Sequence, residues 1–527
     1  MKFLTRTQHM GTAAILLGAS VFLSRFMGLL RDKVISYYYG AGIDADIYFA
    51  SFVVPDFINY LLAGGYFSIT LIPLLTRRFA ESEDSGWRLF STIFLWVCVS
   101  STLCVALAWI FAPQLALLTA PGFVNTPEAL ERLIFFLRII LPGQAFFLPG
   151  ACLSALLYMR KQFVSPAIMP LIYNGATILG GLAMLYCAPE RGMEGFCWGV
   201  LAGAIFGAFL LPFAAVSSGG LRLIFSCRDK GFLVFILLAL PLMIGQSIVV
   251  LEEQFIRIFG SMAGEGSVSL LAYARRVALV PAGVVAQAAG VASYPFLASL
   301  AVSGDKIRFD QTLNIAMKNA LALAIPVCVW MGAAAAPLIR LLFEQGRFTA
   351  ASTHTSSLLL AIMLPAMLCW VVHQLVSRAF YAHEDTLTPA VIGTGVTVLF
   401  LPVYWGFTNY AAVYGVAVAG FLAVTAYTVL LTAVWIRRYG RNALGGMGSH
   451  LARGIGVCIA PGAAAFALAA FLPSLMPGMP LTGALFAILG SGLLFCGLYL
   501  ALALRFAPHH LAPVKTVLDK VAAKFRQ

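Results

Sequence analysis

Residues 13–33 read AAILLGASVFLSRFMGLLRDK, an apolar run with Arg25 near its middle and Arg31 close to its end. Arg25 lies 12 positions after Ala13, which is about 18 Å along a helix that rises 1.5 Å per residue. That distance is about half of a hydrocarbon layer roughly 30 Å thick, and a charge at this depth costs about 2.5–3.5 kcal/mol on insertion scales. The run therefore predicts a transmembrane helix whose central arginine serves a function.

The composition extends this prediction to the whole chain. Of the 527 residues, 61% are hydrophobic and 10% are charged, and the mean hydropathy is +0.92. Apolar runs of about 20 residues recur from end to end, and they are continuous, whereas the strands of a membrane β-barrel alternate in polarity. The sequence predicts an all-α polytopic membrane protein with about 14 transmembrane helices. It contains no nucleotide-binding GxxxxGK[ST] motif, no catalytic constellation and no clustered metal ligands, so we expect neither an enzyme nor a metal centre.

The basic residues indicate the orientation of the chain. They concentrate in alternate connections, at Arg77, Arg78, Arg88, Arg160, Lys161, Arg222, Arg228, Lys230, Lys306, Arg308, Lys318, Arg437, Arg438, Arg441 and Arg453. The positive-inside rule then puts both termini in the cytoplasm. We interpret the net charge of +13 as a topology signal and a contact with anionic membrane lipids, which excludes a nucleic-acid partner. The basic tail is interpreted either as an amphipathic helix on the inner leaflet or as a loosely ordered segment.

An internal repeat divides the chain. Leu141-Pro142 is followed by Tyr158 and Pro166, and the same residue types recur 223 positions later at Leu364-Pro365, Tyr381 and Pro389. Six predicted spans separate the copies, so the two halves are expected to face the same way, as parallel repeats of transporters do. The predicted division is an N-terminal lobe of six helices (1–220), a C-terminal lobe of six helices (221–440), two additional helices (441–505) and a cytoplasmic tail (506–527).

Positive side chains of both lobes are candidates for one anion site. Arg25 shares a helix with Ser24, Gly28, Arg31 and Asp32, and a helix of the second lobe carries Arg275 and Arg276 shortly before Pro281. Guanidinium groups form bidentate, charge-assisted hydrogen bonds with phosphate and carboxylate groups. The predicted ligand is therefore an anion, above all a phosphate or a diphosphate.

Structural pairing is the alternative for these arginines. Carboxylates that lie in or near predicted spans are available at Asp32, Asp46, Asp56, Glu252 and Glu253. Glu252 and Glu253 fit three roles: counter-charges of the empty site, a coupling site for a cation or a proton, or interhelical pairing that includes Arg257. Gly28, Pro55 and Pro281 are predicted hinges, because glycine and proline permit bending, although kinks also occur in static bundles.

Several motifs resemble the MurJ/MviN family. They are Ser24 to Asp32, Gly40-Ala41-Gly42, Asp46, Phe52 to Pro55, Gly266 to Ser269, Tyr273-Ala274 with Arg276, Gln345 to Thr349, and Phe380-Tyr381 to Thr388-Pro389. The resemblance implies two lobes around a central cavity in the bacterial cytoplasmic membrane. It implies export of the peptidoglycan precursor lipid II, an undecaprenyl-diphosphate disaccharide-peptide, to the outer leaflet.

The resemblance also assigns roles to residues. Carried over by position, Arg25, Arg31 and Arg276 match cavity arginines and Asp46 matches a functional acid, and we add Ser24 as a neighbouring hydroxyl. The expected partners are the polyprenyl-diphosphate-linked glycan, membrane lipids and cell-wall synthesis enzymes, and the chain is expected to be a monomer. No organic cofactor is expected, whereas coupling to a monovalent cation or to the membrane potential is in keeping with such a transporter.

Two positions depart from the family pattern. Asn59 stands where the family has arginine, and Gly64-Gly65 stands where it has Glu-Gly. These changes keep a second hypothesis open, a flippase for another polyprenyl-diphosphate oligosaccharide such as an exopolysaccharide or O-antigen unit. Further alternatives are a cation-coupled multidrug exporter and a non-transporting scaffold. An exporter of organic cations predicts an acidic cavity, whereas the candidate site here is rich in arginine.

Overall fold

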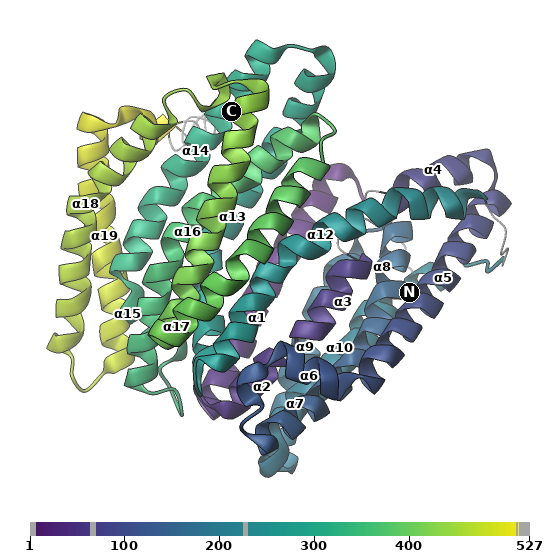
Figure 1. Ribbon diagram of the computed structural model, residues 1–527, viewed down its shortest axis with the longest axis horizontal. Helices are drawn as coiled ribbons and strands as arrows, with labels where there is room; N and C mark the ends of the chain where they lie inside the picture. The colour runs from purple at the N-terminus through teal and green to yellow at the C-terminus, as the bar shows by residue number, and fades with distance from the viewer. Residues whose placement is uncertain (1–6, 64–69, 225–229, 513–514, 516–527) are drawn as a thin grey trace. The chain divides into compact units, whose positions relative to one another are not determined.

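The computed structural model describes residues 7–63, 70–224, 230–512 and 515. These residues form helices joined by short turns, and no strand occurs among them. The chain divides into two compact units, Met1–Ser269 (unit 1) and Leu270–Gln527 (unit 2). Figure 1 shows the helices coloured along the chain. The predicted all-α architecture is confirmed.

Unit 1 is assembled from short and long helices. In chain order these are α1 (Met10–Tyr39), α2 (Ile43–Ala50), α3 (Val53–Ala63), α4 (Ile72–Glu81), α5 (Glu83–Ile110), α6 (Ala112–Thr119), α7 (Pro127–Ile140), α8 (Gln144–Met159), α9 (Val164–Cys187), α10 (Gly192–Gly203), α11 (Leu211–Ser218) and α12 (Lys230–Met262). A buried cluster around Trp87, Phe90 and Leu153 packs α5 against α8. A second cluster around Ile58 and Leu141 packs α3 near the junction of α7 and α8.

Unit 2 contains the longer helices. Helix α13 (Ser267–Ser303) begins at the boundary, and α14 (Lys306–Ala333), α15 (Ala335–Phe343), α16 (Ala350–Ala382), α17 (Leu387–Tyr439), α18 (Met447–Phe471) and α19 (Pro480–Phe506) follow. Helix α17 is two helices joined at Ala411 and Ala412, where the backbone leaves helical geometry. One large apolar cluster, which includes Phe380 and Trp435, holds α14, α16, α17, α18 and α19 together.

Nine helical stretches of the described chain are long and apolar enough to cross a bilayer. Eight contain at least 27 residues, about 40 Å at 1.5 Å per residue. Many of their large apolar side chains, including Leu103, Leu179 and Leu493, are exposed, as expected for surfaces that face lipid. The protein is therefore a multi-pass membrane protein, and the number of fourteen spans stays a prediction.

The internal repeat is confirmed in the local structure. Helices α5 and α14 both contain 28 residues, and their capping residues Ser82 and Asp305 accept a hydrogen bond from the backbone N–H three positions later. The turns after α8 and α16 also match, because Lys161 and Glu384 adopt positive φ values of 59° and 61°. Each pair of equivalent residues is 223 positions apart. The two copies thus fold alike, while the predicted lobe limits at 220 and 440 stay predictions.

The structure differs from the predicted helices in one instructive place. The apolar run from 46 to 75 predicts one continuous span, but α2 ends at Ala50 and α3 starts at Val53. Pro55 therefore stands in the first turn of α3 and not inside a helix. Proline is well tolerated there, because its missing N–H has no partner in a first turn. Whether Pro55 acts as a hinge stays a prediction.

Candidate functional site

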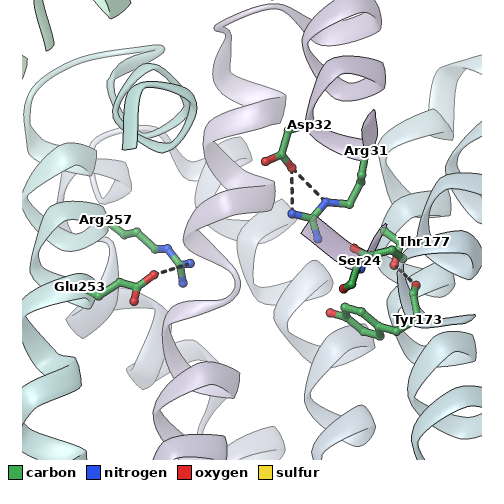
Figure 2. A network of polar contacts seen from close by, with 8 residues as sticks. Ser24, Arg31, Asp32, Tyr173, Thr177, Glu253 and Arg257 are labelled. Atoms are coloured by element: carbon green, nitrogen blue, oxygen red, sulfur yellow. Dashed lines mark hydrogen bonds and ion pairs between the residues drawn. The ribbon is translucent and has the colours of Figure 1, made fainter. Parts of the chain in front are cut away.

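Arg31 is held by its neighbour in the sequence. Its Nε and Nη2 donate hydrogen bonds to Asp32 Oδ1, at 3.0 and 2.8 Å, as Figure 2 shows. The Arg31 side chain is 11% exposed and that of Asp32 is 2% exposed. A buried charge needs such a partner, because an unpaired one loses its hydration without compensation. Asp32 thus has the pairing role that the sequence allowed for it.

One face of α1 packs against α9. Ser20 donates a hydrogen bond to the carbonyl of Ala167, and Ser24 Oγ accepts one from Asn174 Nδ2 at 3.3 Å. Gly28 lies on the same face, where an added Cβ would be 3.9 Å from Asn174 Oδ1. The predicted hinge glycine therefore stands at a helix-packing contact, and its role in bending stays a prediction.

Arg25 lies outside this packed face. A residue next to Ser24 is rotated by about 100° around the helix axis, and Arg25 is exposed, as are Phe22 (75%) and Phe26 (58%). Within the described residues, no hydrogen bond or ion pair to the Arg25 guanidinium is present. Arg25 therefore keeps its hydrogen-bond donors available for a ligand.

A second charged cluster connects α3 and α12. Arg257 Nη1 donates hydrogen bonds to Asp56 Oδ2 at 2.7 Å and to Gln254 Oε1 at 3.1 Å. Arg257 Nη2 lies 3.9 Å from Glu253 Oε1, and Figure 2 shows this pair. Glu253 and Arg257 both lie on α12, so this pair lies within one helix, whereas the contact of Arg257 with Asp56 joins α12 to α3. The contact with Asp56 was not predicted, since 201 positions separate the two residues.

Asn59 has a neutral partner. Its Nδ2 donates a hydrogen bond to Gln144 Oε1 at 3.0 Å, which joins α3 to α8. The position at which the family pattern has a cation therefore makes an amide–amide contact here. Gly64, the other departure, lies outside the described residues.

Asp46 caps a distant helix. It is fully buried, its Oδ2 accepts a hydrogen bond from the Gly266 N–H and its Oδ1 accepts one from the Ser269 N–H, both at 2.7 Å. Gly266 has a φ of +81°, and an added Cβ would lie 2.4 Å from the Ala41 carbonyl oxygen, so only glycine fits. The structure thus gives Asp46 a capping role at the start of α13 that sequence analysis did not predict. Its contact with substrate stays a prediction.

The arginines of α13 belong to unit 2. Tyr273, fully buried, packs on Phe343 and Phe348 with ring centroids 4.9 and 5.6 Å away, which fixes this turn of the helix. Arg275 is half-buried and Arg276 is exposed. Their convergence with Arg25 and Arg31 stays a prediction. The side chains of Glu252 and Pro281 lie outside the described residues.

Residues 345–349 include a residue that packs against the same turn of α13. Phe348 is buried against Tyr273, and Thr349 Oγ1 accepts a hydrogen bond from the Ser352 N–H, which caps α16. The described residues contain no group of three potential metal ligands. The guanidinium groups of Arg25 and Arg276 are exposed, and such groups bind phosphate and carboxylate.

Comparison with known proteins identifies the family. The family model for the lipid II flippase MurJ matches residues 35–488. The chain belongs to the MurJ family. Arg25 and Arg31 precede the first matched residue, so their equivalence to cavity arginines of MurJ proteins continues to rest on the resemblance of residues 24–32.

Relatives and solved structures agree with this family. A probable lipid II flippase MurJ of Rhizobium meliloti (strain 1021) is 28% identical over 437 residues, which cover 81% of each chain. The probable lipid II flippase MurJ of Vibrio cholerae is 26% identical over 400 residues, with 74% and 76% covered.

A solved structure of lipid II flippase MurJ in an inward closed conformation has a TM-score of 0.75 at 22% identity, and covers 93% of this chain and 98% of its own. An inward-facing multidrug transporter of the MATE family and the MOP superfamily has a TM-score of 0.67 at 14% identity, with 82% and 99% covered. The predicted MurJ-like transporter fold is thereby confirmed.

Proposed function

We propose that this MurJ-family chain flips lipid II from the inner to the outer leaflet of the bacterial cytoplasmic membrane, with both termini in the cytoplasm. The family match over residues 35–488 carries this proposal. The accessible guanidinium of Arg25 supports it, because the lipid carries a diphosphate that needs a positive partner near the membrane interior.

The mechanism assigns each part of the substrate to its own environment. The diphosphate binds Arg25, with Arg31 and Arg276 contributing positive charge, while the sugar and peptide occupy the cavity and the polyprenyl tail stays in lipid. The two lobes then alternate between inward-open and outward-open states. A monovalent cation or the membrane potential drives the cycle, and Glu252 and Glu253 are the candidate coupling carboxylates.

A reconstituted translocation assay tests this function. Purified protein in liposomes that contain labelled lipid II is expected to move lipid to the opposite leaflet, where an added enzyme or quencher detects it. Protein-free liposomes and liposomes with an unrelated membrane protein provide the baseline. If translocation stays at that baseline under every ion and potential gradient applied, the proposal is wrong.

A second substrate class is favoured by one observation. Asn59 makes a neutral hydrogen bond to Gln144 where the family pattern has a cation, so this chain lacks one positive charge for the lipid II head group. Another polyprenyl-diphosphate oligosaccharide is therefore the alternative substrate. Running the same assay with lipid II and with an O-antigen-type lipid in parallel distinguishes the two, since the proposed function requires lipid II to be the faster substrate.

A further inference from the structure

Asp310, in unit 2, is a buried carboxylate. It stands in the second turn of α14, and 6% of its surface is exposed. Among the described residues, neither a hydrogen bond nor an ion pair to its carboxylate is present. Burial of a carboxylate without such a partner is costly, because the charge loses its hydration. Lys306, one turn earlier on α14, and His383 interact electrostatically with the carboxylate, which also lines two cavities.

The first of two cavities beside Asp310 is lined by aromatic rings. It has a volume of about 130 Å³, and Phe309, His383, Trp435 and Tyr439 line it together with Lys306. The four rings contact one another in a cycle, with centroids 4.8 Å apart for Phe309–His383 and 4.4 Å apart for Trp435–Tyr439. Aromatic surfaces of this kind accommodate organic ammonium groups.

Trp435 lines the same cavity. Its side chain is fully buried, and its indole Nε1–H has no acceptor among the described residues. A buried donor of this type usually finds a partner. Lys306 supplies a positive charge on the same lining. The cavity lining thus combines a carboxylate, an ammonium group and aromatic rings.

The second cavity that Asp310 lines is polar. It has a volume of about 370 Å³, and Asp310, Gln311, Asn314 and Asn442 line it. Asn314 Nδ2 donates hydrogen bonds to the carbonyls of Ala443 and Gly445, at 2.9 and 3.0 Å, which fixes the loop that forms one wall. Asp310 therefore lines both an aromatic cavity and an amide-lined cavity.

The depth of the site corresponds to a lipid head group. Asp310 is four residues into α14, about 6 Å from its start, and Tyr439 is the last residue of α17. Tyrosine and tryptophan are enriched at this level of a membrane. Positive-inside orientation assigns this end of unit 2 to the cytoplasmic leaflet.

We propose that Asp310, Lys306 and the ring cycle of Phe309, His383, Trp435 and Tyr439 form a binding site for a phosphoethanolamine group. The ammonium binds the Asp310 carboxylate, and the phosphate accepts hydrogen bonds from Lys306. An alkali cation fits less well, because it needs several oxygen ligands and the aromatic rings supply none. The two sources of this group are an ethanolamine phospholipid and soluble phosphoethanolamine.

Native mass spectrometry of the full-length protein tests the site. Wild-type protein is titrated with ethanolamine, choline and glycerol phospholipids of identical acyl chains. Asp310→Asn keeps the size of the side chain and removes its charge. Glu384→Gln is the matched control, because Glu384 is exposed in the turn after α16 and lines neither cavity. Soluble phosphoethanolamine is added in a separate arm as a competitor.

We expect wild-type protein and Glu384→Gln to prefer the ethanolamine lipid. Asp310→Asn should weaken that binding by about tenfold or more, the usual effect of losing a charge-assisted hydrogen bond. Competition by soluble phosphoethanolamine would support recognition of the head group, and binding of the soluble compound without the lipid would support the site with a soluble source.

Two results would overturn the proposal. One is equal affinity of the wild type for ethanolamine and choline lipids, because the trimethylated head group cannot donate the N–H hydrogen bonds that Asp310 requires. This comparison needs no variant, so it holds even if Asp310→Asn folds poorly. The other is unchanged ethanolamine-lipid binding by a folded Asp310→Asn protein.

Discussion

The arginines on the two faces of α1 differ in exposure and in pairing. On the face that packs against α9, Arg31 is almost buried and bonded to Asp32. On the other face, Arg25 is exposed and has no bonded partner among the described residues. The two arginines, six positions apart on one helix, thus have different roles. A paired charge in a membrane helix holds the structure together, and an unpaired one remains available to a ligand.

Replacement of Asp32 is the change for which we expect the largest loss of stability. Asp32→Ala leaves Arg31 buried without its partner, so we expect a loss of about 3 kcal/mol of stability. Arg25→Ala should change stability by less than about 0.5 kcal/mol, as substitutions at exposed positions usually do. Thermal or denaturant unfolding of both variants in one detergent measures the difference. Similar losses for the two variants would contradict the division between the faces.

Arg257 extends the comparison to α12. Arg257→Ala removes the partner of Asp56, which is partly exposed, so we expect a smaller loss of about 2 kcal/mol. A double-mutant cycle with Asp56→Ala isolates the interaction of the pair. A coupling energy near zero would mean that Arg257 is available for a ligand in the way that Arg25 is.

The same distinction between a structural role and a ligand-binding role can be tested for the acidic residue Asp46. Because both of its oxygens accept backbone hydrogen bonds, Asp46→Ala should lower stability by about 1–2 kcal/mol. Asp46→Asn keeps one acceptor oxygen and should lose about half as much. Unfolding measurements that find both variants as stable as the wild type, together with lost transport, would assign Asp46 to the substrate.

The smallest effect concerns Asp385, in the turn between α16 and α17. Partial burial opposes ionisation, but hydrogen bonds from Thr388 and the Arg438 guanidinium outweigh it and hold the pKa of Asp385 below its ordinary value. A lowered pKa in the folded state stabilises the protein above the unfolded pKa of about 3.9, and this contribution disappears as the pH falls through the folded pKa.

We expect this contribution to stay below about 1 kcal/mol, since Arg438 is half exposed. Unfolding of the wild type and of Asp385→Asn between pH 6 and pH 3 measures it. The two curves should converge at low pH, and a gap that widens on acidification would contradict the assignment.

Local patterns made much of the fold predictable. Apolar runs predicted the helices. The recurrence of Leu-Pro, Tyr and Pro predicted the repeat, which is visible in the matching α5 and α14. The pairing of Glu253 with Arg257 was also accessible, because residues four apart share one face of a helix. The break before α3 was missed, since Pro55 was interpreted as a kink inside a helix although proline also marks helix starts.

Long-range contacts made the rest unpredictable. Asp46 reaches Gly266 and Ser269, more than 200 positions away, and nothing in the residues near Asp46 indicates this partner. The pairing of Asp56 with Arg257 has the same origin. Asp310 was overlooked because it stands next to a basic connection, where a carboxylate is expected to be solvated. The aromatic residues that share a cavity with it include Trp435 and Tyr439 of α17, which no local pattern connects to Asp310.

Translocation of lipid II by the Arg25→Ala protein in liposomes tests the central claim most directly. Arg437→Ala is the control, because Arg437 is an exposed arginine at the end of α17. If Arg25 binds the diphosphate, its variant should remain folded and lose at least about tenfold in rate, while the control keeps the wild-type rate. A folded Arg25→Ala protein that translocates lipid II as fast as the wild type would contradict the account.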